Sequence, residues 1–386
     1  MFFSTPSAQL PVTAPAYYPA LTGVRALAAW LVFFHHFKPF ALDSLGWRAA
    51  QQWHVGVSLF FVLSGMLIGA RYLGRVVPSR AWAGAYLRQR VARIYPLYLL
   101  VTGASFTVFQ WNVDYDIAQA WKWYGPTGKA LAIGLNATFL RGFFDHFKYS
   151  GIIQGWTLTV EECFYFAAPL LLFGLRGRPW RLVAYALALV GIGTALVVVA
   201  PHPYGFFDSF AFMFRFTFFG RCTEFLAGMG LAVLVVSQRH LPGRFYTWGG
   251  LAWIGAVVTA MAWSSAQAQA DGDAPLPLFL NNVVLAPGVC ALFYGLVREQ
   301  TTLRWLLETP VFTLLGRASY AFYLIHMGVL SQFLRFHVTS NVLALFLLTN
   351  LMAIGLYKGV EEPLQRWIGG RRQKAPREEA LAGQPA

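Results

Sequence analysis

The sequence predicts an all-α, polytopic membrane protein with about ten transmembrane helices in one bundle. Three observations lead to this prediction. Apolar runs of a length suited to a bilayer recur along the chain, 57% of the 386 residues are hydrophobic and only 12% are charged, and arginines gather in alternate loops. A soluble domain carries about 25% charged residues, and about 20 apolar residues in a helix cross the hydrocarbon core. Helices are the expected spanning element because they satisfy their backbone groups internally.

The predicted spans divide the chain into three parts. A short N-terminal cytoplasmic segment (1–20) precedes the transmembrane domain (21–366), and a charged tail (367–386) is expected to be disordered. Two shorter segments, 130–142 and 206–219, are expected to be interfacial or re-entrant. The ten spans are predicted near 21–38, 54–73, 88–110, 156–175, 182–200, 221–237, 246–264, 278–297, 311–333 and 340–359.

Charge supports this topology. The loop after the second span holds Arg71, Arg75 and Arg80, and every second loop after it is again basic, whereas the 265–277 loop has two Asp and no basic residue. The alternation predicts both termini in the cytoplasm. It also accounts for the net charge of +14. No basic tract suits a nucleic-acid groove, so no nucleic-acid partner is expected.

The first span carries two polar side chains on one face. Arg25 and His36 are eleven residues apart, which is about 1100° of helix rotation and about 16 Å of rise, so they share a face while His35 points about 100° away. A cation and an imidazole inside an apolar helix are costly in lipid and mark a bundle interior or a wet cavity. The alternative is a helix start with interfacial Arg and His.

Two further spans carry polar residues with competing interpretations. Ser64 lies among small residues that favour close helix packing. The alternative is a nucleophilic Ser64, but the GxSxG motif typical of such serines is missing. Arg90 and Arg93 share a face at the cytoplasmic edge of the third span. They suit a phosphorylated ligand, or they only anchor the helix.

Adjacent carboxylates lie inside the fourth span. Glu161 and Glu162 must pair with a cation or stay protonated, since an isolated charge there is strongly disfavoured. One of them is a candidate to orient a catalytic imidazole, or to form a structural pair with an arginine.

Other polar residues have mainly structural interpretations. Arg221 and Glu224, three apart, are expected to form an ion pair, and His326 is a second imidazole in an apolar span. Glu361 and Glu362 precede Pro363 at a helix end. The three cysteines lack metal-site or disulfide spacing, so no metal is expected. The 111–155 loop holds aromatics suited to interfacial anchoring or to carbohydrate stacking, namely Trp111, Tyr115, Trp121, Trp123 and Tyr124.

These residues leave two functions open. A proton-coupled transporter uses buried ionisable groups as a relay, and an intramembrane enzyme uses a His base. A transporter is often built from internal repeats with broken helices, and neither is evident here.

Seven motifs in order along the chain resemble the acyltransferase-3 family of integral membrane acyltransferases. LTGVRALAAWLVFFHH resembles LxGLRxLAAxxVxxxH, FFVLSGMLIG resembles FFVLSGFLI, and RVARIYPLYLL resembles RRxxRIxPxY. GWTLTVEECFYFAAPLLL resembles WSLSVEEQFYLxxPLLL, with Cys163 in place of the usual Gln. GRCTEFLAGMGLA, LGRASYAFYLIHMGVL and VEEPLQRW resemble the remaining motifs.

The resemblance implies an enzyme of the inner membrane of the cell that transfers an acyl group, commonly acetyl from acetyl-CoA, onto a hydroxyl of a carbohydrate or glycosylated acceptor. It implies that His36 is the base or acyl-handling residue and that Arg25 contacts the donor. Glu161, Glu162, Arg93, Arg221, Glu224 and His326 lie at motif positions without a settled role. The resemblance leaves open the acceptor, the acyl chain, the oligomeric state, and the choice between direct transfer and an acyl-histidine intermediate.

Overall fold

The computed structural model confirms the all-α prediction. It describes residues 17–42, 44–175, 178–238, 240–268 and 275–369, and these contain helices and loops but no strand apart from one isolated bridge between Phe144 and Phe206. Of the predicted N-terminal segment and tail, residues 1–16 and 370–386 lie outside the described residues.

Each predicted span corresponds to helix. Seven helical segments in the described part of the chain are long and apolar enough to cross a membrane. The three other predicted spans correspond to α1, α10 and α14. The long helices are α1 (Pro19–His36), α3 (Val55–Tyr72), α4 (Arg80–Trp111), α6 (Trp156–Leu175), α7 (Arg181–Val199), α9 (Phe218–Val236), α10 (Tyr246–Ala268), α12 (Leu285–Arg298), α14 (Pro310–Ile325) and α16 (Val342–Leu356).

Short helices and single turns join these spans. The predicted interfacial segment 130–142 overlaps the C-terminal part of α5, and the segment 206–219 contains α8. The short helices are α2 (Leu45–Gln51), α5 (Pro126–Ala137), α8 (Phe210–Phe216), α11 (Pro275–Phe279), α13 (Thr302–Glu308), α15 (Val329–His337) and α17 (Glu362–Gly369). The 3₁₀ turns are η1 (Val113–Tyr115), η2 (Trp121–Trp123), η3 (Arg141–Phe143), η4 (Ile153–Gly155) and η5 (Pro203–Gly205), and the π-helical turns are η6 (Leu280–Val284) and η7 (Tyr357–Glu361).

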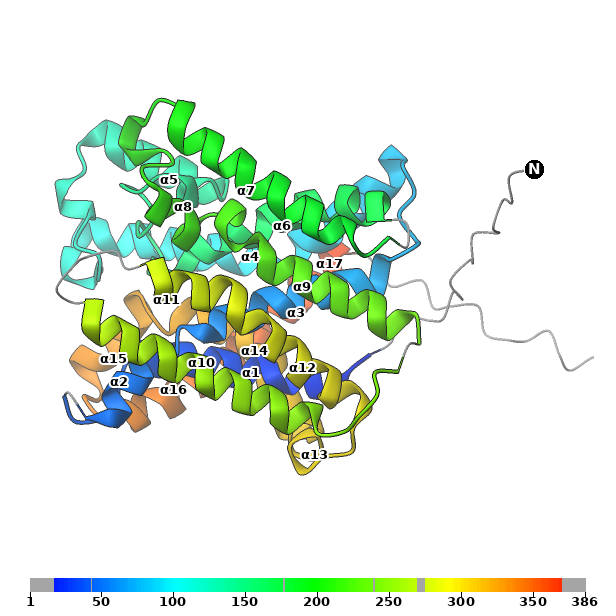
Figure 1. Cartoon of the computed structure of the whole chain (residues 1–386). Coiled ribbons are helices and arrows are strands. Elements are labelled where there is room, and N and C mark those ends of the chain that lie inside the picture. The colour runs from blue at the N-terminus through cyan, green and yellow to red at the C-terminus, as the bar shows by residue number, and fades with distance from the viewer. Residues whose placement is uncertain (1–16, 43, 176–177, 239, 269–274, 370–386) are drawn as a thin grey trace, which may run out of the picture.

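Helix α1 lies inside the bundle and packs along α14 and α3 (Figure 1). Toward the left of Figure 1, where α1 ends at His36, lie α2, α5, α11 and α15. Helix α7 runs along the upper edge and buries only Gly193 and Val197, so most of its apolar side chains face outward. An apolar outer face of this kind is what lipid solvates.

Helices α3 and α9 approach closely through glycines. A Cβ on Gly65 would lie 2.0 Å from the carbonyl oxygen of Phe225, and a Cβ on Gly228 would lie 2.0 Å from that of Val62. Any larger residue at either position would therefore push the backbones apart. The small residues of FFVLSGMLIG thus serve packing, as their composition predicts.

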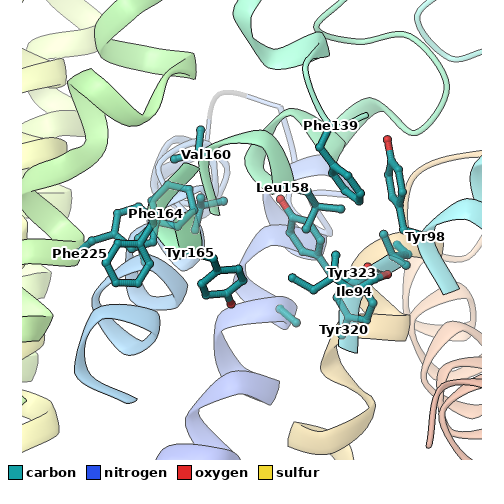
Figure 2. Packing of buried hydrophobic residues seen from close by; sticks show 14 of the residues in the cluster. Ile94, Tyr98, Phe139, Leu158, Val160, Phe164, Tyr165, Phe225, Tyr320 and Tyr323 are labelled. Carbon is teal, nitrogen blue, oxygen red and sulfur yellow. Dashed lines mark hydrogen bonds between the residues drawn. The ribbon is translucent and has the colours of Figure 1, made fainter. Parts of the chain in front are cut away.

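Aromatic rings fill the interior between α6 and the helices beside it (Figure 2). Phe164 stacks on Phe225 with ring centroids 4.4 Å apart, and Phe225 stacks in turn on Phe61 at 4.6 Å. On the other side, Tyr98 packs against Phe139 at 4.3 Å. The stacked rings thus join α6, which carries the two predicted glutamates, to α9 and join α9 to α3, whereas the contact of Tyr98 joins α4 to the segment after α5.

The predicted span 311–333 is wrong as one continuous helix. Helix α14 ends at Ile325, and α15 begins at Val329. Between them Gly328 has φ of 145°, a conformation that glycine adopts readily and that interrupts the helix. His326 therefore lies at a helix end inside the protein.

The 111–155 segment folds into a compact cap. Trp121 is buried against Phe106 and Phe109, whereas Trp111 and Trp123 are exposed. Arg141 is fully buried and donates hydrogen bonds to the carbonyl oxygens of Ser150 and Ile152. The cap therefore holds a fixed conformation next to the start of α6.

Candidate active site

A cavity of about 550 Å³ opens at the end of the bundle where α1 ends. None of the described residues that line it is acidic. Its walls come from α1, the turn before α3, α3, α6, α8–α11, η6, the cap and Tyr323 of α14. The polar side chains on these walls include His35, His36, His54, Gln154, Arg221 and Asn281.

Four imidazoles form a row at this cavity. The ring centroids of His54 and His35 are 5.4 Å apart, those of His35 and His36 are 4.8 Å apart, and those of His36 and His326 are 5.5 Å apart. His36 is exposed to the cavity, whereas His326 is fully buried behind it. Among the described residues, no three histidine, cysteine or carboxylate side chains converge as metal ligands would.

Three of the four imidazoles are anchored to backbone carbonyls. The Nδ1 atoms of His35 and His54 lie 3.3 and 3.2 Å from the carbonyl oxygens of Ala50 and Gln51. That of His326 lies 2.8 Å from the carbonyl oxygen of Tyr323. The His36 ring makes no hydrogen bond to any described residue. His36 is thus the imidazole of this group whose two nitrogens are both open to chemistry.

Arg25 lies on the same face of α1 as His36, as their spacing predicts. Its Nε donates to the carbonyl oxygen of Gly316 and to Oγ of Ser319, both at 3.2 Å, so the guanidinium is fixed against α14. The charges that act on it include those of Arg93, Glu161 and Glu361. The predicted helix end at Glu361 and Glu362 is wrong, because α17 continues directly from Glu362 to Gly369. Glu361 is buried and has one unbonded oxygen within the described structure.

The two adjacent glutamates lie in different surroundings. Glu161 accepts a hydrogen bond from Ser64 at 2.7 Å and another from Tyr165. Glu162 is buried, and its Oε1 has no hydrogen-bond partner among the described residues. Neither carboxylate is bonded to His36 in the described part of the chain. The small residues around Ser64 predicted a packing role for it, and they did not indicate that it donates a hydrogen bond to Glu161.

Arg90 is enclosed by aromatic rings. Its guanidinium carbon lies 5.9 Å from the ring centroid of Tyr72 and 5.6 Å from those of Tyr86 and Tyr165. Such contacts stabilise a cation through the ring quadrupole. Arg90 is 7% exposed, whereas Arg93, one turn further on, is partly exposed.

The predicted ion pair between Arg221 and Glu224 is confirmed. Arg221 Nε and Nη2 donate to the two carboxylate oxygens at 2.6 and 2.8 Å, and both side chains are almost fully buried. Nη2 also donates to Oγ of Ser58 at 3.1 Å, and Ser58 donates to Asn281 at 3.3 Å. This network fixes Arg221 in the cavity wall, with Nη1 unused by described residues.

Sequence reasoning missed several lining residues. Asn281 lies in the π-helical turn η6, where the side chain of the neighbouring Asn282 donates to the carbonyl oxygens of Phe214 and Gly220. Two adjacent asparagines in an apolar span were the available signal, because buried amides need partners. Gln154 donates to the carbonyl oxygens of Tyr323 and Leu324, which ties the cap to the end of α14.

The arrangement suits proton transfer beside a developing negative charge. The His36 imidazole, with both nitrogens unbonded, faces the cavity. The Arg221 guanidinium also lines this cavity, and none of its described lining residues is a carboxylate. A neutral imidazole can accept a proton from a hydroxyl, and a fixed cation stabilises an oxyanion. Arg25, at the other end of this face of α1, and Arg93 of α4 offer positive charge to a second anionic group.

Comparison with known proteins gives a family match over most of the chain. A family model described as an acyltransferase domain matches residues 18–358. An acyltransferase of Streptomyces mycarofaciens, named MdmB, is 25% identical over 92% of this chain and 94% of its own length.

Other relatives match less of their own length. Proteins of several Staphylococcus aureus strains that carry the provisional name O-acetyltransferase are 21% identical over 91% of this chain, which spans 58% of their length. A Rhizobium radiobacter protein, named Protein 2 in picA locus, is 31% identical over 25% of this chain and 47% of its own length. No solved structure gives a significant match.

Proposed function

Because this chain belongs to the acyltransferase-3 family of membrane acyltransferases, we propose that it transfers an acetyl group from acetyl-CoA to a hydroxyl of a carbohydrate or glycosylated acceptor, with His36 as the general base. One observation carries the assignment of His36. It is the cavity-lining imidazole whose two nitrogens are both unbonded to described residues, and it shares a helix face with Arg25. A base must reach the proton that it abstracts.

In this proposal the donor enters from the Arg25 end of the bundle. Acyl-CoA is made in the cytoplasm, and the proposed orientation in the inner membrane, which positive-inside topology favours, has Arg25 and both termini on that side. Arg25 and Arg93 would bind the donor phosphates directly. Arg90, which is surrounded by the rings of Tyr72, Tyr86 and Tyr165, would add positive charge near them. The rise of about 16 Å from Arg25 to His36 leaves room for the pantetheine arm along α1.

The chemistry follows by direct attack. The acceptor oxygen forms a bond to the thioester carbonyl carbon while His36 takes the hydroxyl proton. Collapse of the tetrahedral intermediate breaks the carbon–sulfur bond, and the proton passes from His36 to the departing thiolate. Arg221 faces the cavity and favours the transient oxyanion. Formation of an acyl-histidine is the competing route.

The cavity wall supports a sugar-bearing acceptor. Trp156 packs against Phe216 with ring centroids 4.9 Å apart, and Tyr149 packs against Phe216 at 5.9 Å. All three residues line the cavity beside Gln154 and Asn281. The aromatic faces can pack against the apolar C–H face of a pyranose ring, and the adjacent amide groups can form hydrogen bonds with its hydroxyl groups.

The test is transfer of label from radiolabelled acetyl-CoA into cell-envelope carbohydrate by membranes that hold equal amounts of each variant. His36→Ala is expected to lower the rate by about 10²- to 10⁴-fold, the usual contribution of a general base. His35→Ala is the matched control, since His35 is the adjacent imidazole but is anchored to Ala50, and it should keep most of the activity. Unchanged transfer by His36→Ala removes His36 from the mechanism. If the wild type transfers no label from any short acyl-CoA, the proposed reaction is refuted and the transporter hypothesis is favoured instead.

A further inference from the structure

His326 is a buried imidazole behind the candidate base. It lies where α14 ends and is 0% exposed. Phe322 stacks on it at an interplanar angle of 5°, with ring centroids 6.1 Å apart, and the rings of Tyr323 and Phe33 lie 5.4 and 6.5 Å away. Its position and orientation are therefore set by the surrounding rings.

The hydrogen bond of His326 defines its tautomer. Nδ1 lies 2.8 Å from the carbonyl oxygen of Tyr323, and a carbonyl oxygen only accepts, so Nδ1 carries the proton. Nε2 of the neutral ring is then a lone-pair acceptor. That atom is buried and has no partner among the described residues. A buried acceptor without a donor is costly, which indicates that a donor reaches it in the working protein.

His36 is the neighbouring donor. Two imidazoles joined by an in-plane N–H···N hydrogen bond of about 3 Å have centroids about 5 Å apart, since each ring nitrogen lies about 1 Å from its centroid. The centroids of His36 and His326 are 5.5 Å apart. A small rotation of the cavity-facing His36 side chain closes this gap. The two rings are complementary, because His36 has an N–H without an acceptor and His326 has an acceptor without a donor.

We propose that His326 is a positioning residue that accepts the N–H of His36 through Nε2 and so turns the other His36 nitrogen, with its lone pair, toward the cavity. The inference rests on the proposed function of His36 as base. During acyl transfer the acceptor proton adds to the cavity-facing nitrogen and then moves to the thiolate. The proton shared with His326 stays on His36, and Nδ1–H of His326 stays on the Tyr323 carbonyl.

This arrangement gives orientation without a second charge in an apolar site. A carboxylate in the position of His326 would have to be ionised in fully buried surroundings, which is strongly disfavoured. A neutral imidazole anchored by a backbone carbonyl supplies the same acceptor at lower cost. The two glutamates that were candidates for this role have other surroundings, since Glu161 is bonded to Ser64 and Glu162 lies near Arg90.

A matched set of variants at one position tests the proposal. The side-chain amide of Gln reaches the position of the ring Nε2 and supplies an oxygen acceptor there, whereas the amide of Asn reaches only the position of Nδ1. In the acetyl-transfer assay, His326→Asn and His326→Leu are expected to lower kcat by about 10- to 100-fold, the effect of losing one buried hydrogen bond. The KM for acetyl-CoA should change by less than about two-fold, since His326 does not touch the donor.

His326→Gln is expected to recover at least about ten-fold of that loss. Gln and Asn both leave a gap beside Phe322, so a purely structural role for His326 would lower the activity of both variants alike. Equal kcat values for the Gln and Asn variants, or a loss confined to KM, would overturn the proposal.

A measurement without turnover separates this inference from the proposed function. In full-length protein labelled with ¹⁵N-histidine in lipid bilayers, the Nε2 resonance of His326 is assigned by its loss in His326→Asn. A shift of this resonance in His36→Ala is expected if the two rings share a hydrogen bond. An unmoved resonance overturns the inference even where the wild type transfers acetyl groups. Failure of the wild type to transfer any label refutes the reaction instead, and the resonance still decides whether His36 and His326 are paired.

Discussion

Replacing Glu224 with Gln is expected to lower the free energy of unfolding by about 4 kcal/mol. The charges of Arg221 and Glu224 are centred about 4 Å apart, which at an effective dielectric constant of about 20 corresponds to about 4 kcal/mol. The side chains of Arg221 and Glu224 are 6% and 0% exposed, so solvent screens the pair little. The variant leaves a buried guanidinium without a counter-charge, since no other described carboxylate forms an ion pair with Arg221. Loss of one partner of a buried pair costs about 3–5 kcal/mol.

The same substitution at an exposed pair is the control. Glu362 bonds to Arg366 at 2.7 Å, one helical turn away, but the Arg366 side chain is 76% exposed. Glu362→Gln should therefore cost less than about 1 kcal/mol. Unfolding in mixed micelles of mild detergent and dodecyl sulfate, followed by tryptophan fluorescence, measures both variants. Losses that agree within about 1 kcal/mol would refute the reasoning, because burial would then make no difference. Arg221→Leu combined with Glu224→Leu should restore most of the stability, since it removes both buried charges.

Two further predictions use the same assay. Gly228→Ala should destabilise the protein by about 1–3 kcal/mol, because its Cβ would lie 2.0 Å from the Val62 carbonyl oxygen. Gly255→Ala is the control and should not destabilise the protein, because a Cβ at Gly255 meets open space. Equal effects of the two substitutions would contradict close packing as the cause. Partial burial acts to raise the pKa of Glu299, but hydrogen bonds from Thr247 and the start of α10 outweigh it and lower that pKa. A lowered folded-state pKa means that Glu299 stabilises the protein above its unfolded-state pKa and that this contribution disappears as the pH falls through the folded-state value. Glu299→Gln should therefore cost about 1 kcal/mol at pH 7, as loss of a helix cap does, and progressively less in acid; a loss that does not depend on pH would contradict this.

The helices and part of the site could be predicted because their signals are local. Apolar runs of bilayer length account for the spans, and the eleven-residue spacing places Arg25 and His36 on one face of α1. The ion pair between Arg221 and Glu224 joins side chains one turn apart, so its geometry follows from helix periodicity alone. The family resemblance also depends on short motifs in order, each contained in one segment.

The parts that were missed depend on backbone irregularities. The break at Gly328 divides a predicted span and leaves His326 at a helix end. The π-helical turns at Leu280–Val284 and Tyr357–Glu361 place Asn281 in the cavity wall and Glu361 in the interior. Apolar periodicity does not show where a turn holds one extra residue, because both turns contain polar residues that interrupt the apolar pattern.

Local sequence patterns are enough to show that the chain crosses a membrane repeatedly, that it is an acyltransferase of this family, and that Arg25 and His36 lie on one face of a buried helix. The neighbours that complete this face follow from the folded arrangement of the helices. Arg25 meets Gly316, 291 positions away, and His36 lies beside His326 at the far end of the same partner helix. The reason is physical: a helical pattern reports which side of a segment avoids lipid, whereas the partner that covers this side is selected by packing among helices that are distant in the chain.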